Sequence, residues 1–349
     1  MKTEYVDLRD GKDVKEGLYK ATEIIKTGGL VAFPTETVYG LGANGLDENA
    51  VPKIYEAKGR PSDNPLILHI SDFDEIKSLV KEIPDVAFVL ADEFWPGPLT
   101  MVFKKSDIVP YRTTGGLESV AVRMPSNRIA RELIKAAGVP VAAPSANSSG
   151  RPSPTKASHV LEDLDGKIDM VIDGGTVDIG LESTIVDVTG EVPVILRPGF
   201  ITEEMLSEAI GRVKTDEAVK NLSPDKDLKP KAPGMKYRHY APQGKMTIYK
   251  GNPEKVVKII NEETAKSEGK KTAVLATDET KRYYKADIVI SVGSREDCES
   301  IAHNLFDALR SFDDMGAEII FSEGFDESRL GFAIMNRLHK SAGYNIVNV

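Results

Sequence analysis

Two successive alternations of strand-like and helix-like segments constrain the fold of this 349-residue chain more than any other feature. Up to about residue 210, short apolar runs alternate with segments whose apolar residues recur at helical spacing. The runs predict strands at 30–33, 66–70, 99–103, 119–123, 139–143, 170–173, 185–188 and 192–196. Because such an alternation is typical of α/β proteins, we predict an N-terminal α/β domain built on a mixed sheet.

Local signals refine this first pattern. Gly28-Gly29 predicts the end of a helix that carries apolar residues over 18–25. Asp47 is a candidate N-cap for the next helix. The segment 34–42 reads as a turn rich in Thr and Gly, and Thr189-Gly190 predicts a hairpin between the last two strands.

A second alternation follows residue 244. Strands are predicted at 246–249, 272–275, 288–291 and 319–322, with helices at 254–261, at 301–312 and from about residue 330. The pattern predicts a smaller Rossmann-like domain with a parallel sheet. Between the two patterns lies a Pro- and Lys-rich stretch that suits an extended connection. We predict a catalytic domain at 1–211, a connection at 212–244 and a C-terminal domain at 245–349.

Bulk composition excludes several classes of protein. A net charge of -9 argues against broad binding to nucleic acids or membrane surfaces. The single cysteine, Cys298, excludes an intrachain disulfide, and the five histidines show no metal-ligand spacing, so we expect no protein-bound metal. No apolar run approaches the roughly 18 residues of a membrane span. The start of the chain lacks the pattern of a signal peptide, and we expect a cytoplasmic protein without a membrane partner.

Two nucleotide-binding motifs can be set aside. No Gly-x-x-x-x-Gly-Lys-Ser/Thr sequence occurs, so a P-loop is absent. The run 40–45 satisfies Gly-x-Gly-x-x-Gly, but residues 34–39 separate it from the preceding strand. A dinucleotide fingerprint would begin directly at the strand end, and we expect no NAD site here.

Polar and cationic residues follow several predicted strands. Thr35, Arg123, the segment 144–150 and Arg197 each come at or after a strand end, where ligands bind in open α/β sheets. Each has a structural alternative. Lys58 and Arg60 suit a helix C-terminus, Ser145 and Asn147 suit turns, Arg123 suits a surface ion pair, and His69 in an apolar run suits the core.

The charges suit a nucleoside triphosphate with Mg²⁺. Lys58, Arg60 and Arg197 could offset phosphate charge, and Ser and Asn side chains could hold further phosphate oxygens. No candidate nucleophile is paired with a general base, so covalent catalysis is disfavoured. Positioning and electrostatic stabilisation would carry the reaction.

Several motifs resemble the threonylcarbamoyl-AMP synthase family in its long form with an extra C-terminal domain. They are Pro34-Thr35-Glu36, Tyr39-Gly40-Leu41, Lys58-x-Arg60 with Asn64-Pro65-Leu66, Val122-Arg123-x-Pro125, Ser145-x-Asn147, Ser153, Ser183-Thr184, Arg197-x-Gly199, the stretch 233–242 and the ending 333–337. The resemblance covers nearly the whole chain.

The resemblance implies a twisted open mixed sheet with a concave basic cleft, and an ATP-dependent nucleotidyltransferase. Such an enzyme makes L-threonylcarbamoyladenylate from L-threonine, bicarbonate or CO2 and ATP, with release of pyrophosphate. This is the first step of the t6A modification at position 37 of tRNA. The implied partners are Mg²⁺ bound to ATP, the downstream tRNA threonylcarbamoyl-transferase machinery and a weak contact with tRNA.

The resemblance also assigns residues to two substrates, with Lys58 and Arg60 as the catalytic pair. ATP would be bound by Lys58, Arg60, Asn64, Ser119, Ser145, Asn147, Ser153, Arg197 and Tyr237. Threonine would be held by Thr35, His69, Arg123, the backbone of Ala143 and Ser183. The connection at 212–244, with Tyr237, would act as a lid.

An alternative from another class is an RNA-binding or ribosome-maturation protein that uses the basic cleft. The acidic net charge and the lack of aromatic residues near the cations weigh against it.

Overall fold

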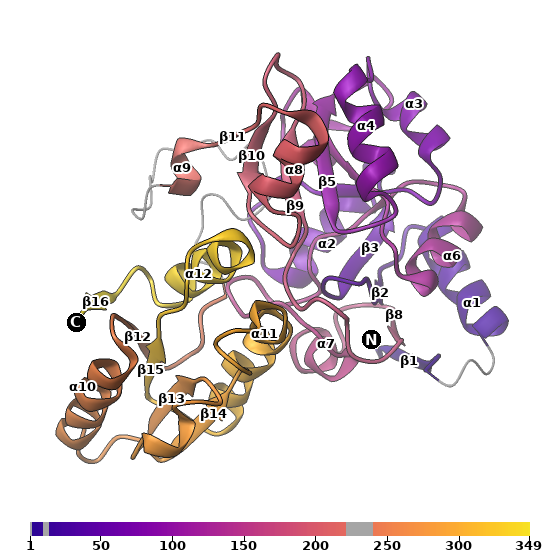
Figure 1. Cartoon of the computed structure of the whole chain (residues 1–349). Coiled ribbons are helices and arrows are strands. Elements are labelled where there is room, and N and C mark those ends of the chain that lie inside the picture. Colours follow the sequence, from indigo (N-terminus) through magenta and orange to yellow (C-terminus); the bar gives the residue numbers. More distant parts are fainter. Residues whose placement is uncertain (1, 10–13, 221–239) are drawn as a thin grey trace. The chain divides into compact units, whose positions relative to one another are not determined.

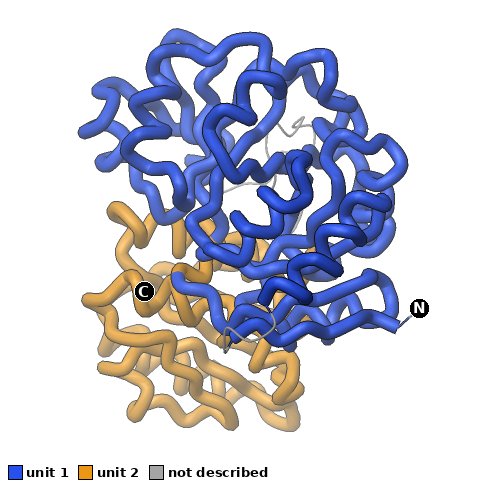
Figure 2. Tube along the Cα trace, turned by 90° about the vertical axis from the view of Figure 1, so that its right-hand side faces the viewer, with its two compact units in different colours: residues 1–149, 153–178, 182–236 blue, residues 150–152, 179–181, 237–349 orange. Residues whose placement is uncertain are grey.

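The computed structural model describes residues 2–9, 14–220 and 240–349. The chain divides into two compact units (Figure 2). Unit 1 comprises Met1–Ser149, Ser153–Asp178 and Glu182–Lys236, and unit 2 comprises Gly150–Pro152, Ile179–Leu181 and Tyr237–Val349. Among the helices that the structure describes, none has the length and apolar character to cross a membrane.

Unit 1 is built on an eleven-stranded sheet in the order β1-β8-β2-β3-β7-β4-β6-β5-β9-β10-β11 (Figure 1). The strands are β1 (Glu4–Asp7), β2 (Val31–Phe33), β3 (Gly40–Asn44), β4 (Ile67–His69), β5 (Leu99–Lys104), β6 (Ser119–Arg123), β7 (Val141–Ala142), β8 (Met170–Asp173), β9 (Thr184–Asp187), β10 (Val194–Arg197) and β11 (Lys214–Thr215). Pairing is parallel at β4·β6 and β5·β9 but antiparallel at β2·β3 and β3·β7. The predicted mixed sheet is therefore confirmed.

Helices cover both faces of this sheet. They are α1 (Val14–Lys26), α2 (Val51–Lys58), α3 (Ile76–Leu79), α4 (Asp85–Phe94), α5 (Tyr111–Thr114), α6 (Arg128–Ala137), α7 (Ala157–Leu164), α8 (Glu203–Ile210) and α9 (Glu217–Lys220), with a 3-10 turn at Phe73–Glu75. Val31 and Phe33 belong to the core that includes residues of α1 and α6, whereas Ala32 belongs to the core that includes residues of α2, α4 and α7. Successive side chains of β2 thus enter two different cores, as the period of a strand requires.

Most predicted strands of unit 1 are present with shifted ends, and the hairpin of β9 and β10 is antiparallel as predicted. Two local predictions are wrong. The run from Gly40 to Asn44 is strand β3 rather than a turn, because pairing with β2 and β7 overrides the low strand propensity of glycine. Asp47 does not cap α2: Ala50 holds that position, and Asp47 accepts a hydrogen bond from the Asn49 amide instead.

Unit 2 contains a five-stranded parallel sheet in the order β14-β13-β15-β12-β16. Its strands are β12 (Lys245–Lys250), β13 (Thr272–Ala276), β14 (Ile288–Ser291), β15 (Ile319–Glu323) and β16 (Ile346–Asn348). Its helices are α10 (Pro253–Lys266), α11 (Cys298–Asp314) and α12 (Arg329–Ser341), with a 3-10 turn at Lys281–Tyr283. The parallel sheet predicted for the C-terminal region is confirmed.

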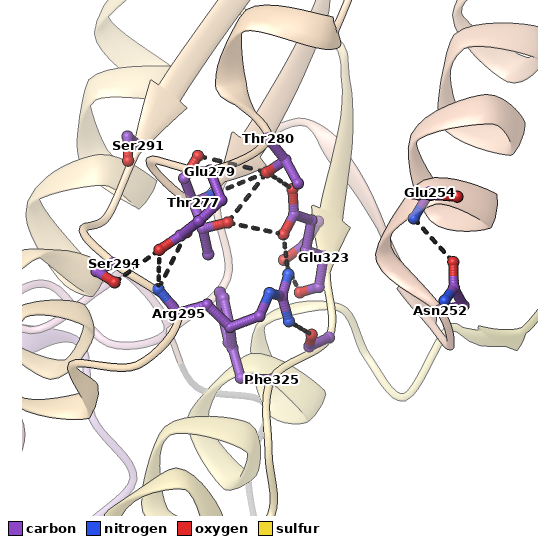
Figure 3. A network of polar contacts seen from close by, with 12 residues as sticks. Asn252, Glu254, Thr277, Glu279, Thr280, Ser291, Ser294, Arg295, Glu323 and Phe325 are labelled. Carbon is purple, nitrogen blue, oxygen red and sulfur yellow. Dashed lines mark hydrogen bonds and ion pairs between the residues drawn. The ribbon is translucent and has the colours of Figure 1, made fainter.

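A buried carboxylate closes the carboxyl edge of this second sheet (Figure 3). Glu323, at the end of β15, is 1% exposed and pairs with Arg295. It accepts hydrogen bonds from Thr277 (3.3 Å), Thr280 and Tyr284 (2.7 Å). Burial and the adjacent carboxylate raise the pKa of Tyr284. The network satisfies the buried charge internally and stabilises the edge.

The described start of the predicted connection at 212–244 holds β11 and α9. β11 pairs in parallel with β10, so this part belongs to the sheet of unit 1. Most of the connection, including Tyr237, lies outside the described residues.

Candidate active site

The strand ends that carry the predicted site residues point in two opposite directions along the sheet. β2 and β7 run in one direction, whereas β4, β6 and β10 run in the other. Thr35 and Ser145 therefore follow strands at one edge. His69, Arg123 and Arg197 end strands at the opposite edge. Strand ends alone do not gather these residues, and loops must complete the site.

The loop after β2 supplies the first bridge. Three strands separate β2 from β6 in the sheet, yet the Arg123 guanidinium donates from Nη1 to Thr37 Oγ1 at 3.0 Å. The loop must therefore fold back across a face of the sheet. Its turn is fixed by Thr35 Oγ1, which contacts Thr37 Oγ1 at 2.8 Å and donates to the Val38 carbonyl at 2.7 Å.

Arg123 also forms a buried ion pair with Glu36. Arg123 Nη2 lies 2.7 Å from Glu36 Oε1, and its Nε donates to the Gly97 carbonyl at 3.3 Å. Burial raises the pKa of Glu36, but the adjacent Arg123 outweighs it and holds that pKa below its usual range. The Glu36 carboxylate thus balances the charge of Arg123. Because both side chains are buried, the surface ion pair considered as an alternative for Arg123 is excluded.

His69 lies beside this pair as a neutral side chain. It is 3% exposed, its Nδ1 is 3.2 Å from the Ile67 carbonyl, and its ring meets Phe33 edge-on at 6.5 Å. Burial, reinforced by the charge of Arg123, lowers the pKa of His69 to about 3. At neutral pH its imidazole offers hydrogen bonds without adding charge to the site.

Lys58 joins two of the sequence motifs. It ends α2, directly before Gly59, whose left-handed backbone (φ 60°) turns the chain. The buried Lys58 Nζ donates to the carbonyls of Ser145 and Asn147 at 2.5 Å and lies 3.3 Å from Asn147 Oδ1. Ser145 Oγ donates to the same Oδ1 at 2.6 Å. The Lys-x-Arg and Ser-x-Asn motifs therefore form one cluster.

Arg60 and Asn64 extend this cluster along the following turn. Arg60 Nη2 donates to the carbonyls of Asn64 and Pro65 at 3.4 and 3.2 Å. Asn64 is 1% exposed, and its buried Oδ1 accepts no hydrogen bond from the residues that the structure describes. A buried acceptor of this kind is available to a donor on a ligand.

Ser183 and Arg197 form a third contact group. Arg197 donates from Nε to the Ser183 carbonyl (3.0 Å) and from Nη2 to Ser183 Oγ (3.1 Å), and Thr100 Oγ1 lies 2.8 Å from the same hydroxyl. Beside this group, Ser153 Oγ donates to Glu182 Oε1 at 2.5 Å. Arg197, assigned to ATP by the resemblance, thus contacts a residue assigned to threonine.

The remaining predicted site residues are Ser119, Ala143 and Tyr237. Ser119 begins β6, opposite Lys104, and makes no side-chain hydrogen bond to the described part of the chain. The Ala143 amide donates to the Ile67 carbonyl at 2.9 Å. Tyr237 lies outside the described residues.

Sequence reasoning missed the acidic members of the site. Glu36 pairs with Arg123 and Glu182 accepts from Ser153, while Thr37 and Thr100 supply further hydroxyls. Glu36 and Thr37 sit inside the quoted 34–42 segment, and Glu182 directly precedes Ser183. A buried cation needs a nearby anion, and this requirement could have marked Glu36 as the partner of Arg123.

Comparison with known proteins covers both units. Residues 23–199 match a family model described as telomere recombination, and residues 201–343 match the model of the threonylcarbamoyl-AMP synthase C-terminal domain. The threonylcarbamoyl-AMP synthase of Pyrococcus abyssi is 53% identical, covering 94% of this chain and 95% of the relative. That of Bacillus subtilis is 47% identical, covering 99% of this chain and 100% of the relative.

A solved structure gives the same result for the fold. The crystal structure of Pyrococcus abyssi Sua5 complexed with L-threonine matches with a TM-score of 0.94 at 50% identity, covering 99% of this chain and 100% of that one. The match extends over both α/β patterns. The chain belongs to the threonylcarbamoyl-AMP synthase family.

Proposed function

We propose that this chain makes L-threonylcarbamoyladenylate from L-threonine, bicarbonate or CO2 and ATP, and releases pyrophosphate. This reaction is the first step of the t6A modification of tRNA, and its product is an intermediate of that pathway. The observation that carries the proposal is the contact of Lys58 Nζ with Ser145 and Asn147, which unites two motifs in a chain that resembles synthases over its full length. In this proposal the three residues would offer a cation, a hydroxyl and an amide to ATP.

L-Threonine is the amino-acid substrate, in line with the L-threonine complex of the Pyrococcus abyssi structure. We propose that His69, Arg123, Ser183, Thr35 and the Ala143 carbonyl hold it. Arg123 keeps N–H groups beyond those given to Glu36, Thr37 and Gly97, and these would bind the threonine carboxylate. Because Glu36 already balances the guanidinium charge, directed hydrogen bonds rather than net charge would fix the amino acid.

ATP would occupy the cluster of Lys58, Arg60, Asn64, Ser145 and Asn147, with Ser119, Ser153, Arg197 and Tyr237 as further contacts. Mg²⁺ would arrive as part of the ATP substrate. The described residues hold no group of three or more His, Cys, Asp or Glu side chains that could bind a metal, and we assign the ion no protein ligand. Lys58 and Arg60 would stabilise the charge that develops on the departing pyrophosphate.

The proposed reaction has two steps. The threonine amine adds to CO2 and loses a proton, which gives a carbamate. A carbamate oxygen then attacks the α-phosphorus of ATP, the bond from the α-phosphorus to the bridging oxygen breaks, and pyrophosphate leaves. The product is a labile mixed anhydride, so excluding water is part of the task. We propose that the part of the 212–244 connection that follows β11 and α9 serves as the lid.

Two further partners belong to the proposal. The labile adenylate must reach an enzyme that transfers the threonylcarbamoyl group to tRNA, and we propose such a transferase as the downstream partner. A weak contact with tRNA would assist this transfer.

Mass spectrometry of the nucleotide product tests the function. The full chain is incubated with ATP, L-threonine and ¹³C-bicarbonate, and we expect a threonine adenylate that carries one ¹³C atom together with an equal amount of pyrophosphate. Omitting threonine is the control and should abolish pyrophosphate release. Release of ADP and phosphate, or an adenylate without the label, would refute the proposed reaction.

A further inference from the structure

We propose that Arg310, on α11 of unit 2, is a positioning residue for the loop that carries Ser145, Asn147 and Ser153. Through this loop it would set the affinity of the active site for ATP. The inference rests on the proposed function, because it takes these residues as ATP contacts. It adds a role for the C-terminal unit that the reaction itself does not require.

Arg310 is bound to the backbone of the loop. Its side chain is fully buried, at 0% exposure. Nε and Nη2 both donate to the carbonyl of Pro152, at 3.1 and 2.7 Å. Hydrogen bonds from a charged donor are stronger than neutral ones, and a buried guanidinium cannot easily give up its acceptors. The Pro152 carbonyl is therefore held in one place.

Pro152 is the last residue of the tripeptide Gly150–Pro152, and the other two residues are also held within unit 2. The Gly150 carbonyl accepts a hydrogen bond from the Ala241 amide at 2.9 Å. Arg151 Nη2 lies 3.9 Å from Asp313 Oδ2, near the end of α11. Gly150, Arg151 and Pro152 are assigned to unit 2 as a group, although Ser149 and Ser153 on either side belong to unit 1.

A second tripeptide, Ile179–Leu181, also belongs to unit 2, and its Gly180 lies against the same helix. Gly180 has a φ of +83°, and a Cβ at this position would lie 2.6 Å from the carbonyl oxygens of Ala302 and His303. Only glycine permits so close an approach of loop and helix. The next residue after this tripeptide is Glu182, which accepts the hydrogen bond from Ser153.

Chain connectivity carries these constraints into the site. Pro152 is bonded to Ser153, and Gly150 lies three residues after Asn147. Since a residue spans at most about 3.6 Å, a shift of Pro152 cannot be absorbed before it reaches these side chains. A displacement of about 1 Å at reacting groups can cost 100-fold in rate. Release of Pro152 should therefore weaken ATP binding before it affects the binding of threonine.

Steady-state kinetics of Arg310→Gln tests this role, with Arg310→Lys as the conservative variant. We expect Arg310→Gln to raise the KM for ATP by about 10- to 100-fold with a smaller change in the KM for threonine. Arg310→Lys should recover part of the loss, because Nζ can still donate to the Pro152 carbonyl. Equilibrium binding of ATP to the same variants gives a readout that does not depend on turnover.

Glu323→Gln is the matched control for damage to unit 2. It also changes a buried charge, and its hydrogen-bond partners, Thr277, Thr280, Tyr284 and Arg295, include no residue of either tripeptide. It should lower the melting temperature and leave the KM for ATP unchanged. Equal ATP affinities of Arg310→Gln and the wild-type chain, or equal losses in Arg310→Gln and Glu323→Gln, would overturn the inference.

Gly180→Ala covers the case in which Arg310→Gln does not fold. Its methyl group would push the second tripeptide away from α11, and we expect weaker ATP binding through Glu182 and Ser153. Unchanged ATP binding in Gly180→Ala would then count against the inference. If the wild-type chain binds ATP but forms no labelled adenylate, the proposed function fails, while the ATP-binding comparison still decides the role of Arg310.

Discussion

Arg123 and Glu36 form an ion pair of 2.7 Å whose two side chains are only 4% and 5% exposed. The pair connects the end of β6 to the loop after β2, two segments that the sheet keeps three strands apart. The pair thus fixes the position of the loop after β2 relative to β6, which the strand order alone does not determine. Because both charges are out of water, neither can be removed without leaving the other uncompensated.

Replacing Glu36 by Gln should lower the free energy of unfolding of unit 1 by about 3–5 kcal/mol, since it leaves a buried guanidinium without its anion. Denaturant unfolding followed by circular dichroism measures this loss. The double variant Glu36→Gln/Arg123→Met should be more stable than Glu36→Gln alone. A loss below about 1 kcal/mol in Glu36→Gln would mean that the pair behaves like an exposed one.

Lys58→Met should slow threonine-dependent release of pyrophosphate by about 30- to 1000-fold, the usual cost of removing one charged group that stabilises a transition state. Lys53→Met is the matched control. Lys53 lies on the same helix, and its Nζ donates to the Gly28 carbonyl at 2.6 Å, away from the Ser145 loop. Similar rates for the two variants would remove Lys58 from the catalytic pair.

The neutral state of His69 makes stability depend on pH. Its pKa is lowered from 6.5 to about 3 in the folded chain, so between these values the unfolded chain binds a proton that the folded chain does not. Stability is therefore full above pH 6.5 and falls as the pH drops toward 3, by at most about 1.4 kcal/mol per pH unit.

Denaturant titrations between pH 6.5 and 5.5 measure that slope, in a range where most carboxylates stay ionised. In the variant His69→Gln, the slope of the free energy of unfolding against pH should fall by the contribution of about one titrating group. His339→Gln serves as the comparison, because the pKa of His339 in unit 2 is also lowered by burial. An unchanged slope in His69→Gln would show that His69 binds a proton as readily in the folded chain as in the unfolded chain.

Much of the fold could be predicted because single segments specify it. The apolar runs of β6 and β8 have the predicted bounds, since burial on both faces gives a strong local signal. β3 could not be predicted in this way. Its glycines have low strand propensity and adopt strand conformation because β2 and β7 pair with them. Strand order likewise depends on contacts distant in sequence.

The site could be predicted as a set of residues but not as a geometry. Motif spacing identified Lys58, Ser145 and Asn147, and the structure brings their polar groups together. The partners of Arg123 could not be found from strand ends, because the loop that carries Glu36 crosses the sheet to reach it. Spacing along a strand gives no information on how far a loop folds back.

Substrate choice provides the final prediction. The proposed threonine site contains hydroxyl-bearing side chains, of which Ser183 Oγ and Thr100 Oγ1 lie 2.8 Å apart. A pocket built to hydrogen-bond a substrate hydroxyl rejects an analogue without it by about 10⁴-fold, whereas one methyl group is worth only about 10- to 200-fold. We therefore expect kcat/KM to fall modestly for serine and steeply for valine, as measured by pyrophosphate release with each amino acid. In Ser183→Ala the ratio of kcat/KM for threonine to kcat/KM for valine should fall, because the pocket has lost one polar partner. Turnover of valine at the rate of threonine would contradict the assignment of this polar pocket to the amino acid.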